Sequence, residues 1–156
     1  MFGPFCAWIC LVFLVGCSPK NLPTFPVSGS VEFEDGEPVR IGTIEFRQEA
    51  SQGSNGERIM ARGKISEDGT FTLTTFEPND GAIEGAHQIT IHQMVVVEDR
   101  SFKDHGHGRR VSPKYSDYAS SGLSADIKAV PKSDTSTNRV KLQLKLDPSD
   151  KKTKGK

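Results

Sequence analysis

The chain has 156 residues, of which 20 are Lys or Arg and 20 are Asp or Glu, so its formal net charge at pH 7 is zero. Because the charges cancel, no global field attracts nucleic acid, and we predict no nucleic-acid partner. Its length is that of a single domain, and three cysteines are too few for a disulfide-rich scaffold.

The first feature in chain order is an apolar run that ends in Leu14-Val15-Gly16-Cys17. Phe5 to Val15 has the length of the apolar part of a signal peptide and is shorter than the roughly 20 residues of a spanning helix. A buried N-terminal helix is the alternative. The tetrapeptide resembles a bacterial lipobox, which implies signal cleavage between Gly16 and Cys17 and attachment of lipid to the thiol of Cys17.

This resemblance divides the chain into four parts. Residues 1–16 are a predicted lipoprotein signal peptide, 17–24 the lipidated cysteine with a short linker, 25–147 a β-sandwich domain and 148–156 a disordered basic tail. Cys6 and Cys10 would be removed with the signal peptide, so no thiol would remain free. Ser18 follows Cys17, and the absence of Asp there resembles the outer-membrane pattern. It implies anchoring in the bacterial envelope, on the periplasmic or surface face.

After the linker, apolar and polar residues alternate, which predicts strands with one buried and one solvated face. We predict strands at 27–33, 43–47, 58–65, 70–75, 86–97, 123–129 and 140–146. Asp35-Gly36 predicts a turn, and Glu67-Asp68-Gly69 predicts a hairpin between the third and fourth of these strands. No segment has a helical period of similar strength. The sequence therefore predicts an all-β fold, a seven-stranded antiparallel β-sandwich.

The order of short motifs adds to this prediction. Val27-x-Gly29-x-Val31, Gly36-x-Pro38-Val39 and Gly42-x-Ile44-x-Phe46 come first, and Asp68-Gly69-x-Phe71-x-Leu73, Gly85-x-His87-x-Ile89-x-Ile91 and Pro113-Lys114-Tyr115 follow. This series resembles the carboxypeptidase regulatory-like domains and a group of small bacterial lipoproteins built on them. The resemblance covers about Pro26 to Leu146. It implies a transthyretin-like (prealbumin-like) sandwich and a tether, and no established reaction.

Two groups of histidines are candidate metal ligands. Asp104, His105 and His107 form a short polar cluster whose residue types could bind a divalent metal. The alternative is a solvated loop, because the neighbouring glycines loosen the segment. His87 and His92 are five residues apart on one predicted strand, so they face opposite sides and cannot share a metal. We expect His87 to be partly buried and hydrogen-bonded, and we predict no cofactor.

Thr90 lies on the same predicted strand as His87 and His92. The alternation places Ile89 and Ile91 toward the core and Thr90 and His92 on the outer face.

The chain contains none of the common catalytic motifs, such as a Gly-x-Ser-x-Gly elbow, HExxH or a phosphate-binding loop. We therefore predict that it is not an enzyme. A hydrolase of the transthyretin-like fold is one alternative, although the C-terminus lacks the Tyr-Arg-Gly-Ser ending of the purine-pathway hydrolase with that fold.

A glycan- or ligand-binding module is the second alternative. Phe102, Tyr115 and Tyr118 are candidate stacking residues in a loop region, although for Tyr115 we favour a packed ring whose hydroxyl bonds to backbone. Our main prediction is a membrane-tethered, non-catalytic lipoprotein that acts as an envelope structural or interaction module. Its predicted partners are the membrane, through the lipid anchor, and an envelope protein or polysaccharide.

Overall fold

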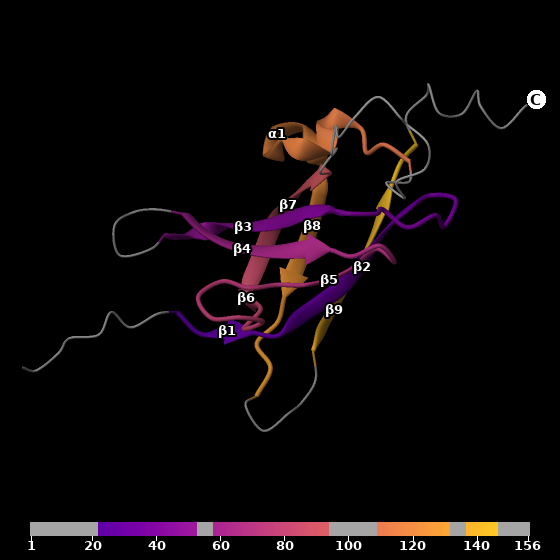
Figure 1. Ribbon diagram of the computed structural model, residues 1–156. Coiled ribbons are helices and arrows are strands. Elements are labelled where there is room, and N and C mark those ends of the chain that lie inside the picture. Colours follow the sequence, from indigo (N-terminus) through magenta and orange to yellow (C-terminus); the bar gives the residue numbers. More distant parts are fainter. Residues whose placement is uncertain (1–21, 53–57, 94–108, 132–136, 147–156) are drawn as a thin grey trace, which may run out of the picture.

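The computed structural model describes residues 22–52, 58–93, 109–131 and 137–146, and this part of the chain is all-β (Figure 1). Its strands are β1 (Thr24–Phe25), β2 (Val27–Phe33), β3 (Gly42–Gln52), β4 (Arg58–Ile65), β5 (Thr70–Thr72), β6 (Ala82–Ile83), β7 (Gly85–Gln93), β8 (Leu123–Ile127) and β9 (Asn138–Leu144). The 3-10 helix η1 (Pro113–Ser116) and helix α1 (Tyr118–Ser121) are both short. The all-β prediction is therefore confirmed.

The strands form two larger sheets and one small one. The larger sheets have the orders β5-β2-β9 and β4-β3-β7-β8, and β1 pairs with β6. β2 runs antiparallel to β5 but parallel to β9, from the pair Val27 and Asn138 to the pair Phe33 and Leu144. The prediction of antiparallel pairing throughout is therefore wrong for β2 and β9. Alternation determines which face of a strand is buried, but both pairing directions leave that face unchanged.

Each of the seven predicted strands overlaps a strand of the structure, residues 94–97 of the fifth lie outside the described residues, and the two-residue strands β1 and β6 are additions. The predicted hairpin at Glu67-Asp68-Gly69 is wrong in the pairing of β5, because β5 pairs with β2. β5 ends earlier than predicted because the chain turns toward the other sheet. Arg62 and Thr74 exchange two backbone hydrogen bonds of 2.8 Å, which join β4 to the residues after β5. The two larger sheets are therefore connected along this side.

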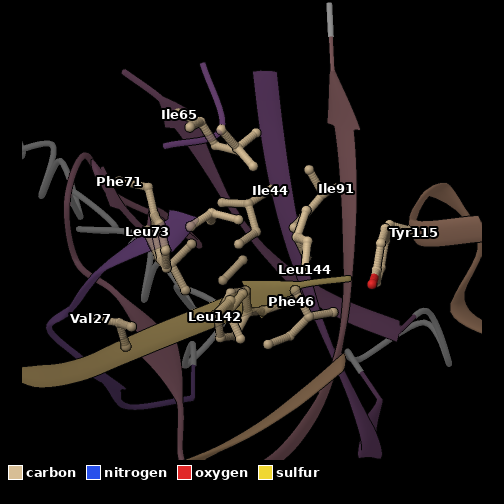
Figure 2. Close-up of a cluster of buried hydrophobic side chains, with 14 of the residues drawn as sticks. Val27, Ile44, Phe46, Ile65, Phe71, Leu73, Ile91, Tyr115, Leu142 and Leu144 are labelled. Atoms are coloured by element: carbon tan, nitrogen blue, oxygen red, sulfur yellow. The ribbon is translucent and has the colours of Figure 1, made fainter. Parts of the chain in front are cut away.

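Both larger sheets contribute to one hydrophobic core (Figure 2). The three-stranded sheet contributes Val27, Val31, Phe33, Phe71, Leu142 and Leu144, and the four-stranded sheet contributes Ile44, Phe46, Ala61, Ile65, Ile89, Ile91 and Ile127. The rings of Phe46 and Phe71 meet across the two sheets, with their centroids 6.0 Å apart. Burial of each Val, Leu, Ile or Phe contributes about 1.5–3 kcal/mol, so this shared core is the main source of stability.

Gly29 in the middle of β2 is required by the close packing of β9 and of Phe71. A Cβ atom at position 29 would overlap the backbone oxygen of Val140 on β9 and would lie 2.6 Å from Cζ of the Phe71 ring, closer than non-bonded atoms can approach. Both neighbours can keep their places only if position 29 has no side chain. The small residues Ser28 and Ser30 flank Gly29 on the opposite face of β2.

Candidate functional site

Six of the sequence-predicted site residues lie outside the described residues: Gly16, Cys17, Phe102, Asp104, His105 and His107. Their predicted roles in lipidation, metal binding and ligand binding therefore stay predictions. Among the residues that the structure describes, no group of three or more His, Cys, Asp or Glu side chains could hold a metal ion. In the same ranges, no helix is both long enough and apolar enough to cross a membrane.

Tyr115 is packed into the structure. It is 3% exposed, and its ring extends from the helical segment that contains η1 (Figure 2). Its hydroxyl accepts a hydrogen bond of 2.8 Å from the backbone N–H of Lys145, just after β9. This is the packed ring that we favoured from the sequence. Tyr115 joins η1 to the end of β9, and its ring is not available for stacking on a ligand.

Tyr118 lies on the outer face of the four-stranded sheet. The guanidinium carbon of Arg47 is 3.7 Å from the centroid of its ring, and its hydroxyl donates to Oε2 of Glu45 at 3.3 Å. Burial raises the pKa of Tyr118 above its ordinary value of 10.0. The phenol is therefore protonated at neutral pH and acts as a hydrogen-bond donor.

The neighbours of Tyr118 form a set that we call the outer cluster: Glu45, Arg47, Arg62, Gln88 and Tyr118. Strand register explains why they meet, because Glu45 is opposite Arg62 on β4, and Arg47 is opposite Gln88 on β7. Arg62 Nε donates to Glu45 at 2.8 Å, and Arg47 Nη2 donates to Gln88 at 2.7 Å. Every member is thus bonded to another member or stacked on one.

The outer cluster and α1 explain one departure from the sequence analysis. Thr90 lies on the predicted outer face of β7, yet it is completely buried. The hydroxyl of Tyr118 on α1 donates to Glu45 of β3, and Ser121 at the end of α1 donates to the carbonyl oxygen of Ile89 at 2.5 Å. The expectation of an exposed outer face is therefore wrong at Thr90, because α1 covers it.

His87 and His92 lie on opposite faces of β7, as expected. His87 is 2% exposed, and its Nδ1 donates to the carbonyl oxygen of Gly85 at 2.8 Å. Burial lowers the pKa of His87 below 6.5, and this outweighs the opposite effects of the Gly85 carbonyl and of Asp126. His92 is exposed, with Nε2 3.3 Å from the hydroxyl of Thr90. The structure therefore brings no two histidines of β7 together.

The two ends of the segment 94–108, which contains the predicted metal ligands, are held together. Gln93 donates to the carbonyl oxygen of Arg109 at 3.1 Å and accepts from the N–H of Val111 at 2.8 Å. The guanidinium of Arg109 forms ion pairs with Asp35 at 3.0 Å and Glu37 at 3.1 Å. Sequence analysis missed this anchor, because its partners lie in a turn far away along the chain.

A second feature that sequence analysis missed is a hollow on the outer face of the three-stranded sheet. Its volume is about 430 Å³. We call it the hydroxyl trough and define it by the outward side chains of Ser28, Ser30, Thr70, Thr72, Arg139 and Lys141. Register places them in two rows across the sheet, Thr72–Ser28–Arg139 and Thr70–Ser30–Lys141.

Comparison of the chain with family models, with curated proteins and with solved structures gave no match. The likeness to carboxypeptidase regulatory-like domains therefore stays a prediction from the order of motifs. Two parts of the described surface are candidates for function: the outer cluster, whose members bond to or stack on one another, and the hydroxyl trough, which is open.

Proposed function

We propose that this chain is a membrane-tethered, non-catalytic β-protein of the bacterial envelope that serves as a structural or binding module. The observation that carries the proposal is the spacing between Cys17 and β1. Only residues 18–23 separate Cys17 from the first described strand, and six residues span roughly 19 Å even when fully extended as polyproline II. A lipid on Cys17 would therefore hold the folded part next to the membrane surface.

The proposal includes the finer fold, a transthyretin-like sandwich of the kind found in carboxypeptidase regulatory-like domains. The motifs behind this resemblance have structural uses, which supports it. Gly29 makes room for Phe71, and Gly69 adopts a positive φ of 81° in the turn before β5. The carboxylate of Asp68 accepts from the N–H of Thr70 at 3.0 Å and from its hydroxyl at 2.7 Å. These hydrogen bonds lower the pKa of Asp68.

The non-catalytic part of the proposal is supported by how enclosed polar side chains are used. Tyr115, Tyr118 and His87 each make contacts that hold one element on another or fill the core. The phenol of Tyr118 is protonated at neutral pH, and its contacts with Arg47 and Glu45 fasten α1 to the sheet. Such groups give a stable scaffold, which suits a module that presents a surface to a partner.

Intact mass and membrane fractionation of the native protein test the tether. We expect a chain that begins at Cys17, carries the mass of acyl groups and is found in the membrane fraction. The Cys17→Ser variant should lose the acyl mass and leave that fraction. Cys10→Ser is the matched control, because its thiol would be removed with the signal peptide and the mature product should be unchanged. An unmodified Met1 on a soluble native protein would contradict the proposal.

A further inference from the structure

We propose that the hydroxyl trough binds an acidic polysaccharide, whose carboxylates meet Arg139 and Lys141 while its sugar hydroxyls bond to the serines and threonines. The trough exists because β2 has small residues where it crosses the centre of the sheet. Ser28 and Ser30 point outward, and Gly29 between them faces the Phe71 ring. The long side chains of Arg139 and Lys141 stand on the neighbouring strand β9 and form one wall.

The spacing of the trough suits a polymer better than a single small anion. Successive outward residues on one strand are roughly 6.6 Å apart, and neighbouring strands are about 4.8 Å apart. The two rows of the trough thus offer hydroxyl groups and cations at several points over the width of three strands. A ligand with many hydroxyls and repeated negative charges can use these points together, whereas a lone anion uses only one or two.

The hollow continues beyond β5. A second hollow of about 590 Å³ shares Thr70, Phe71 and Thr72 with the trough and extends to Thr43, Arg62 and Lys64 on the outer faces of β3 and β4. The two hollows meet along β5 because the Arg62–Thr74 bridge joins β4 to the residues after β5. An extended ligand could therefore run from β9 across β5 to β4.

The charge of this surface selects for an anion. Among the described residues, no carboxylate lines either hollow, whereas Arg62, Lys64, Arg139 and Lys141 all do. Lys141 pairs with Glu32 and Arg62 with Glu45, each at 2.8 Å. Within the described ranges, Lys64 and Arg139 form no ion pair. Two cations are thus left to meet negative charge on a ligand.

The lining also favours an acidic glycan over a neutral one. Neutral sugars are commonly held by an exposed aromatic ring, but the ring of Phe71, the aromatic residue that lines both hollows, is 4% exposed. Recognition must then come from charge and hydrogen bonds, which are individually weak at a solvated surface and are screened by salt. Many protein copies tethered to one membrane would compensate through avidity along one polymer.

The test uses the full chain, purified from membranes in detergent, with polygalacturonate as the acidic probe and dextran as the neutral one. Affinity electrophoresis at low ionic strength should show retardation by polygalacturonate and none by dextran. Arg139→Gln should weaken the affinity for polygalacturonate about tenfold, since it removes a charge-assisted hydrogen bond. Arg58→Gln is the matched control: Arg58 is exposed on β4, lines neither hollow, and its loss changes the net charge equally.

A second variant tests the shape of the trough without a change in charge. Ser28→Tyr places a ring in the hollow at the row formed with Thr72 and Arg139, and it should weaken retardation by polygalacturonate at least as much as Arg139→Gln does. Equal retardation by dextran, or equal weakening by Arg58→Gln and Arg139→Gln, would overturn the proposal. Unchanged binding by Ser28→Tyr would overturn it too.

Vesicles that contain phosphatidylglycerol distinguish a polymer from a lipid headgroup. If the protein binds them in an Arg139-dependent manner but does not bind polygalacturonate, the anion belongs to a lipid and the polysaccharide proposal fails. We expect no such dependence. The proposal of a tether and the proposal of a polysaccharide site can be disproved independently. The mass of the native protein tests only lipidation of Cys17, and the Arg139→Gln comparison tests only binding in the trough.

Discussion

The outer faces of the two larger sheets both consist of the outward residues of alternating strands, but one face is covered and the other is open. On the four-stranded sheet, α1 covers Thr90, and each charged residue of the outer cluster bonds to another member of the cluster. On the three-stranded sheet, small hydroxyl residues leave the hydroxyl trough open, and Arg139 has no ion-pair partner within the described residues. A polar outer face can thus stabilise the fold or remain available for binding, depending on what lies over it.

The largest expected loss of stability comes from a substitution at Gly29, which lies beneath the hydroxyl trough. Gly29→Val should destabilise the protein by about 3 kcal/mol or more, because the new side chain would overlap the backbone of β9 at Val140 as well as the Phe71 ring and force both to move. Denaturant unfolding measures this change. Ser28→Ala is the control, since its side chain points outward and should cost less than about 0.5 kcal/mol. Similar losses in both variants would show that the core does not depend on a bare position 29.

The second largest loss of stability is expected from changes to Tyr118, the member of the outer cluster that lies on α1. Tyr118→Ala should cost about 2 kcal/mol, because it removes the ring stacked on Arg47 and exposes Thr90. Tyr118→Phe keeps the ring and should cost about 1 kcal/mol, the usual value of one hydrogen bond. A double-mutant cycle with Arg47→Ala measures the coupling of the two side chains. Additive losses would mean that the stacking contributes nothing.

The third effect is a dependence of the free energy of unfolding on pH, which arises from the buried side chain of His87. His87 has a folded-state pKa below 6.5 because it is buried, so the unfolded chain binds the proton more readily. The free energy of unfolding should therefore decrease as pH falls from 6.5 toward the folded-state pKa and be at its full value above 6.5. Urea unfolding at a series of pH values measures this. His87→Gln should flatten this part of the profile, whereas His92→Gln on the exposed face should leave it in place.

The smallest expected effect on stability is in the hydroxyl trough. Arg139→Gln and Lys64→Gln should each change the free energy of unfolding by less than about 0.5 kcal/mol, because neither cation has an ion-pair partner in the described structure. Thermal unfolding of the two variants beside the native protein provides the measurement. A large loss in either variant would mean that the trough, like the outer cluster, supports the fold.

Strands and their buried faces were predictable because neighbouring residues determine them. The alternation around Val31, Phe46 and Ile89 predicts that each strand has one buried face, and all three residues are in the core. The inward position of His87 followed from the same period. The parallel direction of β9 was not predictable, because Val140 to Leu144 would show the same alternation in either direction.

Side chains at candidate sites were harder to predict, because their surroundings come from distant parts of the chain. The partner of Tyr115 is the backbone of Lys145, and Arg109 binds a turn that contains Asp35. The hydroxyl trough combines β2, β5 and β9, which only the fold brings together. No local pattern distinguishes Ser28 and Thr72 in this trough from ordinary solvated residues of a sheet.

The sequence by itself determined the apolar run that ends at Cys17, the turns at Asp35-Gly36 and Asp68-Gly69, and the inward face of each long strand. These features depend on covalent geometry, on residue type and on a period of two along the chain. The tertiary structure decided which outer face is covered, which cations are paired and where a hollow remains. These depend on contacts between residues far apart in sequence, since α1 lies over β7 and β9 lies beside β2 only once the sheets have assembled.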